Sequence, residues 1–182
     1  MPHQFSTSYI EDSLSLFTYY KKLAEGAMEQ LSDQELFNAL DEEMNSIAII
    51  VKHMAGNMRS RWTDFLSSDG EKPDRNRDSE FAGAPGTRQQ LLDTWNAGWD
   101  KVFRALELLS DRDLERTVFI RAEPHSVMQA VNRQVAHYAY HCGQIVFLAK
   151  HFKGGAWKSL SIPRQRSAEF NRKVLAGEAS QR

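Results

Sequence analysis

The chain of 182 residues has the length of one domain, since domains commonly contain about 100–200 residues. Hydrophobic residues make up 41% of it and charged residues 26%, which is typical of soluble globular proteins and excludes a disordered or fibrous chain. Its 23 basic and 24 acidic residues give a net charge of −1, which argues against binding to nucleic acid or to an anionic membrane surface.

The cysteine content and the N-terminal sequence bear on the cellular compartment. The single cysteine, Cys142, excludes an intrachain disulfide and a cysteine-rich zinc finger, and it favours a reducing environment. The N-terminal segment carries Glu11 and Asp12 and lacks the apolar stretch of a signal peptide. No segment approaches the roughly 18 apolar residues that a membrane span requires. We therefore expect a cytoplasmic protein with a single domain over residues 1–182.

Hydrophobic residues recur every three or four positions in four long segments, as expected for helices with one buried face. The first segment begins with a capping box formed by Ser8 and Glu11. Thr87 and Gln90 open the third segment in the same way, and Pro124 is the expected first residue of the fourth. We expect long helices at residues 7–31, 43–66, 87–109 and 124–152, and shorter helical segments at 32–40 and 165–175.

The connections between these segments complete the predicted fold. Residues 67–86 form an unusually long, charged connection, and loops of this length are commonly functional or mobile. Residues 117–120 are expected to form an extended connector. Four amphipathic helices bury their apolar faces most simply against one another, so we expect an all-α four-helix bundle. Its topology is expected to be up-down, with the long loop between helices 2 and 3, and residues 153–182 are expected to form a tail that packs on the bundle or extends it.

Three histidines are the main candidates for function. His137 and His141 lie on the apolar face of the last long helix, and their spacing of four residues places both side chains on the same side of it. Two imidazoles at this spacing can bind one metal ion. His53 lies at the edge of the apolar face of the second long helix, beside the small residues Gly56 and Ser60. A three-histidine site with an open coordination position is therefore possible, and open positions are typical of catalytic metal sites.

The spacing alone leaves alternatives open. A histidine on an apolar face is commonly a hydrogen-bonded core residue, so a bundle with core histidines and no metal stays possible. Three imidazoles suit zinc, nickel, copper and iron, and we expect zinc or nickel without a basis for choosing between them. A zincin-type peptidase is disfavoured, because Tyr138 occupies the position that carries glutamate in the H-E-x-x-H motif.

The sequence around these histidines resembles a known family. His53 opens the run HMAGNMRSRWTDFLSSDGEKP, and His137 and His141 lie in HYAYHCGQIVFLAKHF. Over about residues 5–155 the chain is similar to the DinB/YfiT-like superfamily, and the DGEKP loop points to an uncharacterised bacterial branch of it. The resemblance implies a four-helix bundle, usually homodimeric, in which these three histidines bind a divalent metal ion. Some members resemble glutathione transferases and use bacillithiol, mycothiol or another low-molecular-weight thiol, while many have no established activity.

Polar residues near the histidines are further candidates. Asn57 lies one turn beyond His53 and is able to hydrogen-bond to a metal-bound water or a substrate, but a solvated or capping role fits it equally well. Gln134 lies three residues before His137 and is a candidate to orient a ligand, whereas Tyr138 is more commonly a core residue. Candidate residues for binding a carboxylate are Arg59, Arg61, Arg75 and Arg77, although charged loop residues are commonly only solvated.

A cysteine and a surface stripe on the last long helix are expected to have structural roles. Cys142 follows His141 directly, and neighbours on a helix point about 100° apart, so we expect a buried structural thiol instead of a nucleophile paired with that histidine. A second stripe on the last long helix, opposite the histidines, combines small and aromatic side chains and needs a second partner. The tail is one candidate for this partner, and we prefer a symmetric homodimer contact. The members of the stripe are Ala136, Tyr140, Gly143 and Phe147.

These observations support a functional hypothesis and one alternative. The hypothesis is a divalent-metal-binding enzyme, a thiol-dependent S-transferase or a related small-molecule transferase or hydrolase. Its expected partners are a second copy of the chain, a low-molecular-weight thiol and an electrophile, with no nucleic acid and no membrane. The alternative is a metal-binding, stress-related helical bundle without catalysis, acting as a binding or sensor protein.

Overall fold

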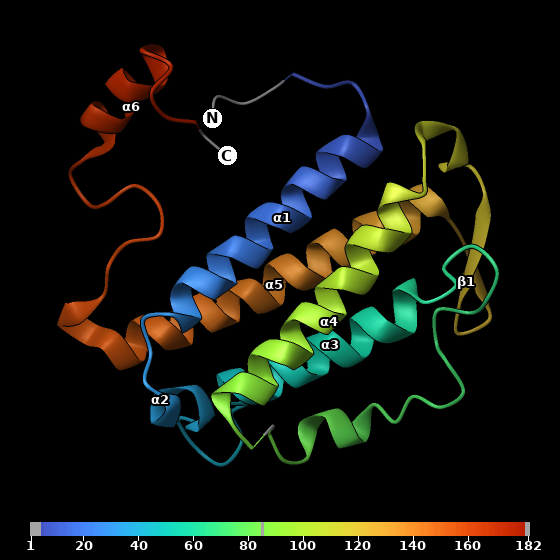
Figure 1. The fold of residues 1–182 in the computed structure, drawn as a ribbon, viewed down its shortest axis with the longest axis horizontal. Coiled ribbons are helices and arrows are strands. Elements are labelled where there is room, and N and C mark those ends of the chain that lie inside the picture. The colour runs from blue at the N-terminus through green and yellow to red at the C-terminus, as the bar shows by residue number, and fades with distance from the viewer. Residues whose placement is uncertain (1–4, 85, 181–182) are drawn as a thin grey trace.

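The computed structural model describes residues 5–84 and 86–180, and these residues are mostly helical (Figure 1). Four long helices, two short helices, three 3-10 turns and one small sheet follow one another along the described chain. In chain order they are α1 (Tyr9–Met28), α2 (Asp33–Phe37), α3 (Ile47–Trp62), η1 (Asp78–Phe81), α4 (Arg88–Glu107), η2 (Asp111–Asp113), β1 (Thr117–Ile120), β2 (Glu123–Ser126), α5 (Val127–Lys153), η3 (Gly154–Ala156) and α6 (Ser167–Leu175).

Each long helix begins after a serine or threonine that caps it. The side-chain oxygen of the cap accepts a hydrogen bond from the backbone N–H three residues later, which satisfies one of the unpaired donors of the first turn. The fourth predicted helix begins later than expected, because Pro124 lies in β2 and Ser126 forms the capping box with Gln129. The four caps are Ser8, Ser46, Thr87 and Ser126.

The four long helices lie side by side around one hydrophobic core (Figure 1). α3 packs against α4, α1 packs against α5, and α3 also contacts α5. An aromatic cluster joins them near the centre: the ring of Phe17 lies 6.0 Å from Trp62, 6.1 Å from Trp99 and 5.7 Å from Tyr138. The backbones of α3 and α5 are thereby held at fixed positions, and these are the helices that carry the three histidines.

The close contact between α3 and α4 depends on Gly98. A Cβ atom at this position would lie 3.0 Å from both Cα of Ala55 and Sδ of Met58. We expect Gly98→Val to lower the free energy of unfolding by about 1–3 kcal/mol, because overpacking forces the helices apart. Urea denaturation of this variant beside Ala97→Val measures the effect. Ala97 is the exposed neighbour on α4, so its variant controls for the helix propensity of valine; equal destabilisation of the two would contradict the close-packing argument.

The segment predicted as an extended connector is one strand of a hairpin. β1 and β2 pair antiparallel, with Thr117 opposite Ser126, and Arg121 and Ala122 form the turn with positive φ angles of 56° and 62°. The carboxylate of Asp69 accepts hydrogen bonds from the backbone N–H groups of both turn residues, at 2.9 and 2.7 Å. The long loop after α3 is therefore attached to the hairpin that precedes α5.

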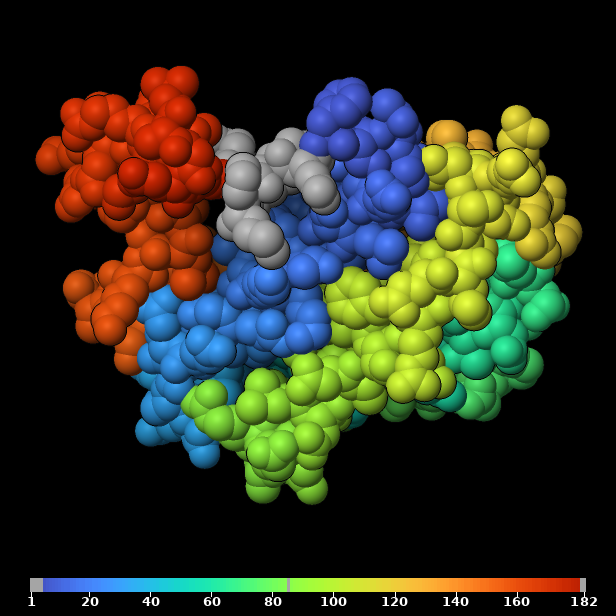
Figure 2. Space-filling model, turned by 45° about the horizontal axis from the view of Figure 1, so that its top comes forward, coloured from blue at the N-terminus to red at the C-terminus, as the bar shows by residue number. Residues whose placement is uncertain are grey.

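After α5, Trp157 and Leu160 still pack against the core, and the chain then leaves it. Gln30 exchanges two hydrogen bonds with the backbone of Lys158, which attaches the start of this tail to the end of α1. α6 contributes no buried residue, and the tail stands out as a separate lobe beside the helices in Figure 2. Among the described residues, no helix combines the length and apolar character needed to cross a membrane.

Candidate metal centre

The structure brings His53, His137 and His141 together between α3 and α5. Their candidate ligand nitrogens all lie within 4.8 Å of one another, and the Nε2 atoms of His137 and His141 are 3.0 Å apart. Because zinc–nitrogen bonds are about 2.0–2.1 Å long, nitrogens on one ion lie about 3–4 Å apart, which requires only small rotations of these rings. The three histidines on these two helices thus form a possible metal-binding cluster.

Two neighbouring side chains orient the rings. Nδ1 of His53 donates a hydrogen bond to Oε2 of Glu80 at 2.8 Å, and Nδ1 of His141 donates to Oε1 of Gln144 at 2.7 Å. Each bond places a proton on Nδ1 and leaves the lone pair on Nε2. Metal-binding histidines commonly donate their second ring nitrogen to a carboxylate or carbonyl group in this way.

The surroundings of His137 and His141 favour their uncharged imidazoles. Burial, with smaller contributions from His141 and His53, lowers the pKa of His137 to about 3. Burial also lowers the pKa of His141, against the hydrogen bond to Gln144 that raises it. A neutral imidazole has a lone pair available for a metal ion at neutral pH, so the electrostatics fit the donor set.

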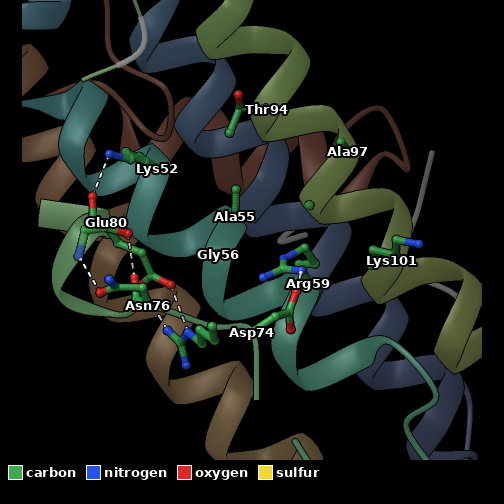
Figure 3. Close-up of a pocket in the computed structure, with 13 residues that line it drawn as sticks. Lys52, Ala55, Gly56, Arg59, Asp74, Asn76, Glu80, Thr94, Ala97 and Lys101 are labelled. Carbon is green, nitrogen blue, oxygen red and sulfur yellow. Dashed lines mark hydrogen bonds and ion pairs between the residues drawn. The ribbon is translucent and has the colours of Figure 1, made fainter. Parts of the chain in front are cut away.

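Glu80 belongs to this site although the sequence analysis did not single it out. It lies in η1, within the long loop, and its side chain reaches α3 at Gly56 (Figure 3). A Cβ atom on Gly56 would lie 2.7 Å from the carboxyl carbon of Glu80, so only glycine allows this approach. Lys52 secures the loop by donating to the carbonyl oxygens of Ser79 and Ala82, at 2.6 and 2.8 Å.

The charge of Glu80 is stabilised by two partners. Arg75 donates from Nε to Oε1 at 2.8 Å and from Nη2 to Oε2 at 3.0 Å, while His53 occupies the second side of the carboxylate. Burial by itself would raise the pKa of Glu80, but the hydrogen bonds from His53 and Arg75 outweigh it, and the pKa is lowered. Glu80 therefore stays ionised and holds His53 in one tautomer.

Asn57 and Tyr138 bond to each other. The hydroxyl group of fully buried Tyr138 donates to Oδ1 of Asn57 at 3.1 Å and accepts from Nε1 of Trp62 at 3.0 Å. Burial raises the pKa of Tyr138 well above its ordinary value, so the phenol stays protonated. These contacts favour a structural role for Tyr138, as the sequence analysis preferred.

Tyr138→Phe tests this structural role. The substitution leaves the buried N–H of Trp62 without its acceptor, and we expect the free energy of unfolding to fall by about 1–3 kcal/mol. The number of metal ions bound per chain should not change. Chemical denaturation and elemental analysis of the same sample measure the two quantities, and a lost metal ion with unchanged stability would assign Tyr138 to the site instead.

A cavity of about 440 Å³ opens beside His53 and His137. Three of the four arginines that the sequence suggested for binding a carboxylate line this cavity, together with Gln134. Arg59 lies elsewhere: it forms an ion pair with Asp74 at 2.7 Å and lines a second cavity of about 490 Å³ between α3 and α4 (Figure 3). The second cavity is larger but contains none of the three histidines. The three arginines are Arg61, Arg75 and Arg77, and the sequence analysis missed Arg121 and Arg133, which line the same cavity.

Cys142 is fully buried, and burial raises its pKa to about 12. Its thiol therefore stays protonated at neutral pH and is no nucleophile. This agrees with the structural role expected from its place on α5.

Comparison with known proteins identifies a family. A family described as "Protein of unknown function (DUF1572)" matches residues 4–166 of the chain. No curated protein and no solved structure gives a significant match. Because the match spans all four long helices and the three clustered histidines, the chain belongs to the DUF1572 family.

Proposed function

We propose that this protein is a divalent-metal-dependent enzyme acting on small molecules, a thiol-dependent S-transferase or a related transferase or hydrolase. The observation that carries the proposal is the convergence of three buried or half-buried histidines beside an open cavity. Structural metal sites are usually closed, whereas a catalytic site keeps a position accessible to water or substrate. Zinc and nickel both suit three imidazole ligands.

The residues around the cluster suit such a centre. His53, His137 and His141 would hold the ion, with Glu80 and Gln144 fixing two of the rings. A divalent ion there would lower the pKa of a bound thiol or water, so that the deprotonated nucleophile is available near neutral pH. The cavity beside His137 is large enough to position a metabolite-sized substrate, since ligand pockets commonly measure about 300–1,000 Å³.

The resemblance to the DinB/YfiT-like superfamily supports the same proposal. We infer that the four long helices form a DinB-like four-helix bundle and that two copies associate. The exposed rings of Tyr140 and Phe147, 62% and 65% accessible on one face of α5, support a homodimer contact there. Burying large apolar side chains of this kind is a common basis for symmetric association.

A metal and activity screen tests the proposal. The purified protein is analysed for bound metal, reconstituted with zinc or nickel, and assayed with a panel of low-molecular-weight thiols and electrophiles. We expect about one ion per chain and turnover that His141→Ala abolishes and the exposed-site variant His151→Ala retains. Bound metal without turnover, in a site that no added ligand enters, would favour the non-catalytic binding protein. Absence of bound metal after reconstitution would favour a bundle with core histidines.

A further inference from the structure

Arginines make up five of the eleven residues that line the cavity beside the histidines. Five arginines reach it from four separate parts of the chain: α3, the long loop, the β1–β2 turn and α5. No aspartate or glutamate is among the residues that line it. The arginines are Arg61, Arg75, Arg77, Arg121 and Arg133.

These arginines differ in how far their charge is already neutralised. Arg61 and Arg75 are buried and share Glu71, whose Oε2 lies 2.9 and 3.1 Å from their Nη1 atoms. Arg133, in contrast, is exposed and has no ion pair among the residues that the structure describes. Arg77 lies over the ring of Phe81, 5.0 Å from its centroid, and its one ion pair among the described residues is a 4.0 Å contact with the fully exposed Asp78. Two guanidinium groups at the cavity therefore have charge available for a ligand.

Two buried polar atoms at the cavity lack a partner. Gln134 is 3% exposed and Arg61 is 6% exposed, and Oε1 of the first and Nε of the second have no hydrogen bond to described residues. Buried polar groups are almost always hydrogen-bonded, so such atoms commonly mark the place of a polar ligand or an ordered water. Both side chains line the cavity but these two atoms are themselves enclosed, so they add polar groups to its wall without marking a contact to a ligand.

We propose that this cavity binds a small organic dianion, either a dicarboxylate or a phosphate monoester. Arginine forks match the geometry of carboxylate and phosphate groups, and the volume of about 440 Å³ suits a metabolite. Arg77 and Arg133 would pair with the anionic groups of the ligand, and Gln134 and His137 line the same cavity. Binding of the anion does not depend on the proposed function. Only the role of this anion as the substrate of the metal centre rests on it.

Isothermal titration calorimetry on the metal-reconstituted protein tests the inference. The probes are succinate and glycerol 3-phosphate, with acetate as the monoanion and glycerol as the neutral control. We expect one of the two dianions to bind at one site per chain, with acetate weaker by about tenfold or more and glycerol silent. The dianion that binds identifies the source as carboxylate or phosphate.

Two exposed arginines allow the site to be mapped without disturbing the fold. We expect Arg133→Gln and Arg77→Gln each to weaken the dianion by about tenfold, because each removes a charge-assisted hydrogen bond. The matched control is Arg59→Gln, an α3 arginine outside this cavity, which should leave the affinity unchanged. Binding that these variants leave unaltered, or no binding of either dianion, would overturn the inference.

The same samples separate this inference from the proposed function. His141 does not line the cavity, so His141→Ala removes a metal ligand without removing a lining residue. If His141→Ala has lost its metal ion but still binds the dianion, the arginine site is supported. The metal proposal is then judged by the metal and activity screen. Full metal occupancy with no dianion binding would overturn the anion site alone.

Discussion

Replacing His137 with alanine is expected to abolish binding of the divalent metal ion at the three-histidine site while the helical content stays the same. The three rings form a triangle: the ring centroid of His137 lies 5.5 Å from that of His53 and 4.6 Å from that of His141, and the latter two are 4.9 Å apart. Two remaining imidazoles give a site with fewer ligands, from which metal dissociates readily. Elemental analysis after dialysis against a weak chelator measures occupancy, and circular dichroism measures helical content.

The control for this experiment is His151→Ala. His151 lies on the same helix, nearly three turns beyond His141, and is exposed. We expect that variant to keep its metal ion. Equal occupancy in His137→Ala and the parent protein would remove His137 from the ligand set.

Glu80→Ala is expected to reduce both stability and metal affinity. Among the described residues, the substitution leaves Arg75, whose side chain is 2% exposed, with Glu71 as its one remaining ion-pair partner. Breaking a buried pair in this way commonly costs about 3–5 kcal/mol. It also removes the acceptor that holds Nδ1 of His53, and loss of such a partner commonly reduces metal affinity about 10–100-fold. Denaturant titration and competition with a fluorescent chelator measure the two effects.

A second variant separates the two roles of Glu80. Glu80→Gln retains a carbonyl oxygen for His53 but removes the negative charge that pairs with Arg75, so we expect metal affinity closer to that of the parent protein and stability still reduced. If Glu80→Ala folded with unchanged metal affinity, Glu80 would be a partner of Arg75 and have no role in positioning His53.

The helices and the histidine cluster could be predicted because their signals are local. Capping residues such as Ser8 and Thr87 act within one turn, and the spacing of His137 and His141 fixes their common direction on a helix. The hairpin was missed for the opposite reason. Glu123–Ser126 includes Pro124 and no alternating apolar residues, so β2 becomes a strand only through its pairing with β1.

Glu80 could not be predicted because its role depends on a long-range contact. It lies 27 residues beyond His53, in a charged loop where nothing in the sequence distinguishes it from other acidic residues. The available signal is Gly56, on the same face of α3 as His53, which leaves room for a side chain from elsewhere. Arg121 and Arg133 were missed similarly, because the fold of the loop and hairpin brings them to the cavity.

A crystal structure of the metal-reconstituted protein, with anomalous diffraction recorded at the absorption edge of the added zinc or nickel, is the most direct measurement. We expect one strong anomalous peak between α3 and α5, within bonding distance of Nε2 of His53, His137 and His141, with Glu80 still bonded to Nδ1 of His53. An anomalous peak elsewhere, or rings that stay apart with no ion between them, would contradict the metal centre on which the proposed chemistry depends.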